Sequence, residues 1–184
     1  MPHLQSPDTH HLSAALGWLE LGCPRDALVE LENISTAQQS HPDVLEIRWA
    51  IHAEAKDWEA ALPVARALTQ AAPDRASGWL HQAYALRRVA AGGLPAAFDL
   101  LRPAADQFPD DPLIAYNLAC YTCQLQQPDA AMKWLARAAL KGDKRIVLRM
   151  ALDDPDLLPL REQIENFGKG SATPRRQSGH GEDD

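Results

Sequence analysis

The chain has 184 residues and a formal net charge of −7, and 46% of its residues are hydrophobic, as in ordinary globular proteins. It contains 31 Ala and 25 Leu against 5 Val and 6 Ile, which favours helices and excludes most all-β and parallel α/β architectures. The acidic balance argues against nucleic acid as a partner, because phosphate binding requires clustered Lys and Arg.

The first segment, residues 1–7, is polar, and we expect it to be flexible. It has neither the basic start nor the apolar stretch of a secretory signal, and no apolar run approaches the ~18 residues of a membrane span. The three Cys do not indicate a disulfide framework. We therefore expect a cytoplasmic protein with reduced thiols and no membrane insertion.

A short motif with a small residue recurs along residues 8–142. Its central positions are Ala27, Ala61, Ala97 and Ala131, which are 34, 36 and 34 residues apart. Between these positions the sequence indicates two amphipathic helices per unit, joined by a short break. The units span about 8–41, 42–75, 76–111 and 112–143. On the second helices, the residues expected on packed faces are Leu31, Leu68, Leu101 and Leu135.

The breaks between the paired helices carry recognisable stop and start signals. Gly22 and the pair Gly92–Gly93 suit the left-handed residue that ends a first helix. Proline is tolerated at the start of a second helix, because the first-turn N–H has no partner within the helix. The prolines at these starts are Pro24, Pro95 and Pro128. In the second unit we expect Asp57 to be the N-cap.

This period, with small residues where helices cross and Pro near the unit ends, resembles the tetratricopeptide repeat. The fourth unit fits best, through Asn117-Leu118-Ala119 with Ala131 and Ala138, and the third places Ala97 and Ala104 on pattern. In the second unit the departures from the pattern are Arg48, Trp49 and His52. The resemblance implies an all-α, right-handed superhelical solenoid of four helix pairs. The strings YNLACYTCQL (116–125) and ALDDPDLLPL (151–160) resemble a bacterial subgroup of this family.

Residues 144–167 are expected to cap the array, because a solenoid must cover its last apolar face. The sequence predicts one helix over 144–153, a stop at Asp154-Pro155, and a final helix to about Phe167 with Asp156 as its N-cap. Residues 168–184 contain no apolar residue larger than Ala, so we expect this tail to be disordered.

In tetratricopeptide arrays the first helices of the pairs line a concave groove that binds peptides or partner helices. The resemblance therefore implies a non-catalytic adaptor or scaffold with a protein or peptide partner, and an amphipathic or acidic peptide would fit. The predicted groove residues are Leu80, Tyr84, Arg87, Arg88, Leu113, Tyr116, Asn117, Cys120 and Gln124. The groove positions expected from the first two units are Leu12, Leu16, Leu19, Glu46, Ala50 and Ala53.

Some members of the family hold a chaperone's C-terminal carboxylate with a clamp of Lys, Asn and Arg. The matching positions here are Leu12, Leu16, Ile47, Ser77 and His81. Because none of them carries the clamp chemistry, we do not expect that function.

Other chemistry has weaker support in the sequence. Cys120 and Cys123 have the spacing of a redox or zinc half-site, but further zinc ligands and a preceding strand are missing, so packing is favoured. The acidic run 153–156 lacks the glycine and distal Glu of a calcium loop. No catalytic or nucleotide-binding motif is present, so we expect no enzyme activity, cofactor or metal site.

Three alternatives stay open: a small acidic chaperone for a secreted client, a thiol-redox or metal protein using Cys120 and Cys123, and a purely structural subunit of a larger complex. The sequence does not decide the oligomeric state.

Overall fold

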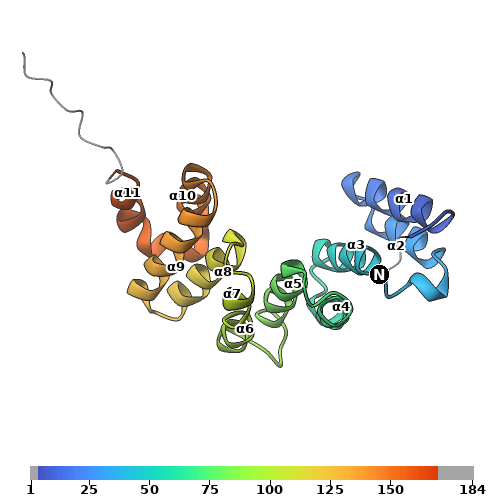
Figure 1. The fold of residues 1–184 in the computed structure, drawn as a ribbon, viewed down its shortest axis with the longest axis horizontal. Coiled ribbons are helices and arrows are strands. Elements are labelled where there is room, and N and C mark those ends of the chain that lie inside the picture. The colour runs from blue at the N-terminus through green and yellow to red at the C-terminus, as the bar shows by residue number, and fades with distance from the viewer. Residues whose placement is uncertain (1–3, 170–184) are drawn as a thin grey trace, which may run out of the picture.

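A computed structural model describes residues 4–169, and within that range the chain is helical and contains no strand. The helices stack in chain order along an open arc, from α1 at one end to α11 at the other (Figure 1). The elements are α1 (Asp8–Glu20), α2 (Pro24–Glu32), η1 (Thr36–Gln38), α3 (Pro42–Glu54), α4 (Trp58–Ala71), α5 (Ala76–Leu86), α6 (Leu94–Leu101), α7 (Ala104–Gln107), α8 (Pro112–Gln124), α9 (Pro128–Lys141), α10 (Lys144–Asp153), η2 (Pro155–Leu160) and α11 (Arg161–Lys169), where η marks a 3₁₀ turn.

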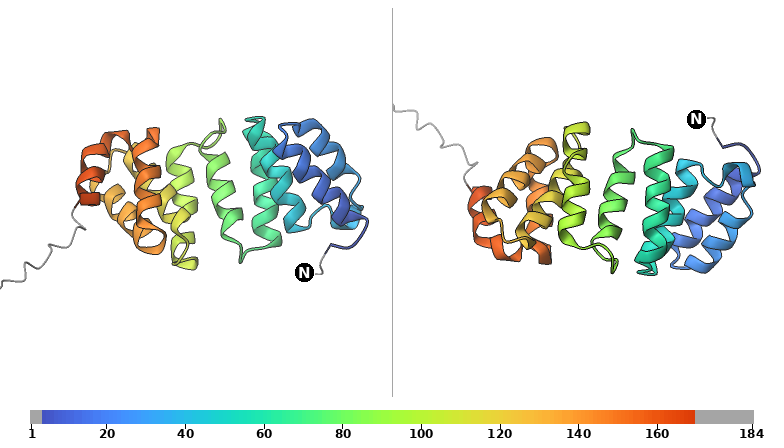
Figure 2. Two further views of the ribbon diagram at one scale, coloured as in Figure 1. Left: turned by 90° about the horizontal axis from the view of Figure 1, so that it is seen from above. Right: turned by 90° about the horizontal axis from the view of Figure 1, so that it is seen from below.

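Packing between the helices is mainly between neighbours in the chain. Each helix contacts the next, and the first helices α1, α3, α5 and α8 also contact one another in sequence (Figures 1 and 2). The buried side chains form three clusters, around α1–α3, around α4 and the end of α5, and from α5 to α11. This arrangement confirms the predicted helical-repeat solenoid, in which the core is a series of local contacts.

The alanines and leucines predicted to face the packed interior are all fully buried. Their exposed fraction is 0% at Ala27, Ala61, Ala97, Ala131, Leu31, Leu68, Leu101 and Leu135. A methyl side chain lets two helix axes approach closely, while the Leu on the same helix face, one turn further along or, for Leu68, two turns, fills the space beside the contact. The recurring small residue is therefore the contact between paired helices.

The turns within the units mostly follow the predicted signals. Gly22 and Gly93 have positive φ, of 73° and 115°, and Lys56 and Gln126 adopt the same sign of φ in the second and fourth units. Asp57 is the N-cap of α4, as predicted, because its carboxylate accepts a hydrogen bond from the Ala60 N–H at 3.1 Å.

Two predictions about helix boundaries are wrong. The third unit does not have one continuous second helix, since α6 ends at Leu101 and α7 begins at Ala104, after Pro103. Proline lacks the N–H that would continue the helical hydrogen bonds and its ring crowds the preceding turn, which explains the break.

The N-cap of the C-terminal segment is Asp154, not Asp156. Asp154 accepts the backbone N–H of Asp156 at 2.9 Å and starts η2, and the α-helix follows only from Arg161. Asp156 already lies within the 3₁₀ turn, so its carboxylate is free to bind elsewhere. Helix α11 extends to Lys169, beyond the predicted tail boundary, while the rest of the predicted tail and residues 1–3 lie outside the described residues.

None of the described helices is both long enough and apolar enough to cross a membrane.

One polar contact closes the first unit. Asp8, in the first turn of α1, accepts hydrogen bonds from the backbone N–H of Ser35 at 2.8 Å and from its hydroxyl at 2.6 Å. These bonds favour the ionised carboxylate, and they lower the pKa of Asp8 below its ordinary value. The contact joins the start of α1 to the turn after α2.

We predict that Asp8→Asn lowers the melting temperature at pH 7 and that this difference shrinks below about pH 4. A carboxylate with a lowered pKa in the folded state stabilises the protein above its unfolded pKa of ~3.9, and this contribution is lost as the pH falls through the folded pKa. Thermal unfolding between pH 7 and pH 2.5 measures the difference. Asp99→Asn, at an exposed position on α6, is the control and should change little at any pH. A loss of equal size at pH 7 and pH 2.5 would contradict the assigned role.

Candidate functional site

A cavity of about 430 Å³ lies between α5, α8 and the segment formed by α10 and η2. Seven of the nine predicted groove residues line it: Tyr84, Arg87, Arg88, Leu113, Tyr116, Asn117 and Cys120. We call it the α5–α8 pocket. Leu80 and Gln124 do not line it, because Leu80 packs against the C-terminal core cluster and Gln124 donates a hydrogen bond to the Asp156 carbonyl at 2.8 Å.

The rest of the α5–α8 pocket comes from the C-terminal cap, which the sequence analysis did not connect with the groove. The cap residues that line it are Met150, Asp154, Pro155 and Asp156. For the acidic run 153–156, the sequence predicts only a helix stop and an N-cap. No local pattern in the sequence indicates that η2 packs against α8, although the need for a cap made such a contact foreseeable.

Arg87 holds the cap through a paired contact with Asp156. Its guanidinium binds both carboxylate oxygens, with Nη2 donating to Oδ1 at 2.8 Å and Nη1 donating to Oδ2. The two side chains are 21% and 23% exposed, so water screens the pair only in part. The hydrogen bond and charge of Asp156 raise the pKa of Arg87, which keeps it protonated.

Asp154 makes a second set of contacts between the cap and α8. Its Oδ2 accepts hydrogen bonds from the Tyr116 hydroxyl at 3.0 Å and from the Cys120 thiol at 3.5 Å. Burial, with the nearby carboxylates, raises the pKa of Tyr116 and of Cys120 well above their usual values, so both groups keep the proton that they donate. The protein's own cap therefore binds four of the predicted groove residues, namely Arg87, Tyr116, Cys120 and Gln124.

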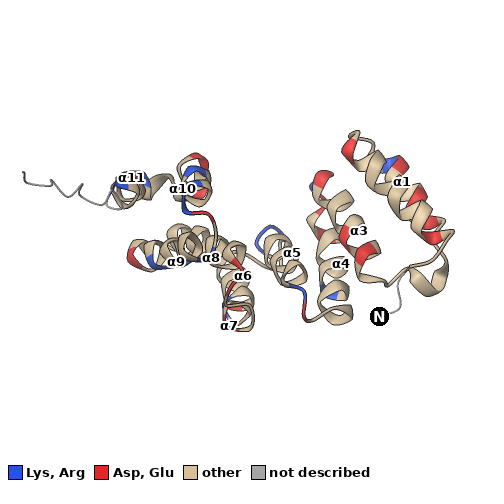
Figure 3. Cartoon of the chain, turned by 45° about the horizontal axis from the view of Figure 1, so that its top comes forward, with Lys and Arg blue, Asp and Glu red and all other residues tan. Residues whose placement is uncertain are grey.

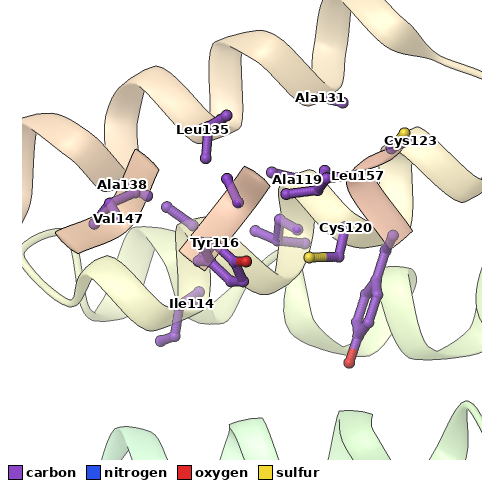
Figure 4. Close-up of a cluster of buried hydrophobic side chains, with 14 of the residues drawn as sticks. Ile114, Tyr116, Ala119, Cys120, Cys123, Ala131, Leu135, Ala138, Val147 and Leu157 are labelled. Carbon is purple, nitrogen blue, oxygen red and sulfur yellow. The ribbon is translucent and has the colours of Figure 1, made fainter. Parts of the chain in front are cut away.

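The two cysteines of α8 are packing residues. Cys120 and Cys123 are each 4% exposed, and burial raises the pKa of both thiols. Figure 4 shows their sulfur atoms pointing to different sides of α8, with only Cys120 on the side of Tyr116. A protonated, buried thiol is a poor nucleophile, so these features oppose the thiol-redox alternative.

Cys120, Asp154 and Asp156 bring three ligand atoms within 4.8 Å of one another, close enough to be considered as a metal site. Asp156 is already bound through both oxygens to the Arg87 cation, and Cys120 retains its proton. A metal ion would have to displace Arg87 and ionise the thiol. The donor set therefore fits an internal hydrogen-bond network better than a metal centre.

Part of the lining of the α5–α8 pocket is apolar and remains exposed to solvent, and we call this part its rim. Tyr84, Leu113 and Met150 remain 37%, 49% and 41% exposed, although all three are large and apolar. A smaller apolar hollow of about 150 Å³ adjoins them on α8 and α10, and includes the exposed Ile146. We call this the Ile146 hollow. It shares Leu113, Tyr116 and Met150 with the larger pocket.

Arg88 lines the same pocket, in the turn that follows α5, and we include it in the rim; Figure 3 shows basic residues at this turn. Its guanidinium is 3.5 Å from the ring centroid of Tyr84 and 5.1 Å from that of Trp58, and Nη1 donates to the Tyr84 carbonyl at 2.8 Å. Among the described residues it forms no ion pair. Burial, followed by the neighbouring Arg87 charge, lowers the pKa of Arg88, but an arginine stays charged near neutrality.

A further concavity of about 300 Å³ lies between α1 and α3, where the predicted groove residues Leu12, Leu16 and Glu46 meet. Glu46 is not free to bind a ligand, because it accepts hydrogen bonds from Ser77 and pairs with His81 at 2.7 Å. Burial opposes ionisation of Glu46, but these contacts outweigh it and lower its pKa. Two of the positions that match the family's carboxylate clamp thus hold an internal carboxylate.

Trp49, which departs from the repeat pattern, packs against His81, the partner of Glu46. Its ring stacks on that of His81, with centroids 3.7 Å apart and planes within 8°. The irregular second unit is thereby joined to the third by a contact between α3 and α5.

No protein-family model and no curated protein matches the chain. Among solved structures, it is similar to TTC0263, a thermophilic tetratricopeptide-repeat protein of Thermus thermophilus, with a TM-score of 0.68 and 16% identity over 88% of this chain and 85% of that one. It is also similar to a double mutant of MamA RS-1, with a TM-score of 0.63 and 16% identity over 78% of this chain and 79% of that one. At this identity the comparison shows the tetratricopeptide-repeat fold alone.

We predict that Arg87 and Asp156 stabilise the cap together, with a coupling free energy of about 1–2 kcal/mol. The measurement is a double-mutant cycle in urea with Arg87→Gln, Asp156→Asn and the double variant. The matched control is the ion pair of Arg102 and Asp106, which is 43% and 69% exposed and should couple by at most ~0.5 kcal/mol. Equal coupling in the two cycles would show that the Arg87 contact adds no more than a surface ion pair.

We also predict that Cys23 is the one rapidly reacting thiol of the folded protein. Cys23 is partly exposed, whereas Cys120 and Cys123 are buried with raised pKa values and should react ~100-fold more slowly. Titration with a chromogenic disulfide reagent should give one fast thiol, none in Cys23→Ser, and all three in denaturant. Fast reaction of either α8 thiol in folded Cys23→Ser would restore the thiol-redox alternative.

Proposed function

We propose that this protein is a non-catalytic interaction module, an adaptor or scaffold, which binds a peptide or helix of a protein partner at the α5–α8 pocket. The observation that carries the proposal is the exposed rim of this pocket. It combines an aromatic ring, two flexible aliphatic side chains and a cation without an ion-pair partner among the described residues.

The composition of the rim supports protein binding. Tyrosine and arginine contribute strongly to protein interfaces because they bury a large area and make directional polar contacts. Leu113 and Met150 supply apolar surface beside them, and a methionine adapts its shape to a partner. Tyr84 and Leu113 belong to first helices, α5 and α8, and in a repeat solenoid the first helices line the concave side, where an elongated segment can contact several units at once.

Catalysis has less support at the same place. The lining of the α5–α8 pocket contains no histidine, and its thiol is protonated and hydrogen bonded. Its carboxylates are committed to Arg87, Tyr116 and Cys120. Membership of the bacterial subgroup, the cytoplasmic location and the chaperone role stay predictions from the sequence.

We predict that Arg88→Glu abolishes capture of the native partner in an affinity purification from the source cells, read by mass spectrometry. The variant reverses a charge on the rim and leaves Arg87, which holds the cap, unchanged. Arg66→Glu makes the same change at an exposed position of α4 and is the matched control. Circular dichroism and melting temperature check that both variants are folded.

A partner that wild type and Arg66→Glu capture and Arg88→Glu loses supports the proposal. If Arg88→Glu captures the same proteins as wild type, the α5–α8 pocket is not the binding surface. If no protein is enriched by any of the three, the adaptor function itself is wrong.

A further inference from the structure

We propose that the partner segment carries a carboxylate that binds Arg88, next to a large apolar side chain that enters the Ile146 hollow. This inference rests on the proposed function and specifies the chemistry of the partner.

The first support is the state of the Arg88 guanidinium. It is held in one orientation by the Tyr84 ring at 3.5 Å, the Trp58 ring at 5.1 Å and one hydrogen bond to the Tyr84 carbonyl. A guanidinium has five N–H donors, and a carboxylate can accept two of them side by side. Arg88 is thus an oriented donor group whose hydrogen-bonding capacity is mostly unused by the described residues.

The second support is that the carboxylates nearby are bound elsewhere. Asp156 gives both oxygens to Arg87. Asp154 accepts from Tyr116, from Cys120 and from the Asp156 backbone. Neither carboxylate therefore forms a direct ion pair with the half-buried guanidinium of Arg88, which is open to a carboxylate from a partner.

The third support concerns the size of the ligand's charge. The same acidic groups that leave Arg88 unpaired also border the α5–α8 pocket. These groups would repel a doubly charged phosphate more strongly than a singly charged carboxylate. Of the two guanidiniums that line the pocket, Arg88 is the one that is not already paired with a carboxylate of the described residues. The chain's net charge of −7 likewise disfavours a polyanion such as a nucleic acid.

The apolar requirement comes from the adjoining hollow. Leu113, Tyr116 and Met150 border both cavities, so a ligand group at Arg88 and another beside Ile146 would be neighbours on one segment. Ile146 is 48% exposed, and a large aliphatic or aromatic side chain would cover it. A protein segment that presents an acidic residue close to a large apolar residue meets both needs.

The test is a selection of random 12-residue peptides displayed on phage against the full-length protein, followed by affinity measurements with the best synthetic peptide. We expect enrichment of Asp or Glu near Leu, Ile, Met or Phe. Arg88→Gln should weaken binding about 10–100-fold, since the lost contact is a charge-assisted pair. Arg88→Lys should recover part of the affinity, and Arg66→Gln on α4 should change it little.

A cycle of protein and peptide variants then isolates each contact. Replacing the peptide's Glu by Gln should weaken binding to wild type but not to Arg88→Gln, and replacing its apolar residue by Ala should couple in the same way with Ile146→Ala. Additive losses at the acidic position would overturn the inference.

The selection also separates this inference from the proposed function. Bound peptides that compete with one another but carry no acidic residue would contradict the inference and leave the adaptor function standing. Failure to enrich any peptide would count against both. A dimer in analytical ultracentrifugation that Arg88→Gln dissociates would show that a second copy, not a partner segment, occupies the pocket.

Discussion

The whole structure depends on the close approach of paired helices at a fully buried alanine once per unit. The residues in this position are Ala27, Ala61, Ala97 and Ala131, and none exposes any surface. A larger side chain there would separate the two helices and also tilt the next pair, because each unit packs on the one before it. The arc in Figure 1 is the sum of these local contacts, and the first helices, which carry the candidate site, take their positions from them.

A chain of nearest-neighbour contacts must end, and the way it ends shapes the site. Without the cap, the last pair, α8 and α9, would expose an apolar face. The cap covers this face with three side chains that become buried there, Leu157, Leu160 and Ile164. To place these side chains, η2 has to pack against α8, and its polar groups then meet the polar groups of α8. The contacts of Asp154 and Asp156 follow from this requirement for stability. The cap consequently takes up part of the groove that the repeat pattern alone would assign to a ligand.

The sequence predicted the features that depend on local periodicity. Buried alanines and leucines recur because they occupy one face of a helix, and Asp57 is recognisable as an N-cap because its hydrogen bond lies within one turn. The partners of Arg87 and Tyr116 were not predictable in this way, since they lie 69 and 38 residues further along the chain. Several carboxylates could satisfy an arginine, and only the path of η2 decides which one does. The error at Asp156 has the same origin, because its assignment as a cap ignored the distant cation that binds it.

Two adjacent arginines after α5 illustrate how the fold gives identical side chains different contacts. Arg87 is the C-cap of α5, and Arg88 follows it in the turn, where the backbone N–H groups of the two residues bond to carbonyls of α5. Arg87 meets η2 and pairs with Asp156, whereas Arg88 turns to the rings of Tyr84 and Trp58. Aromatic faces attract a cation but do not neutralise it, so Arg88 is held in place with its charge intact. The protein already holds the Arg88 side chain in one orientation. Binding of a ligand there would therefore cost less side-chain conformational entropy than binding at a mobile surface arginine. Under the proposed function, the cap thus decides which of the two arginines stays available to a partner: it pairs with Arg87, and none of its described residues makes an ion pair with Arg88.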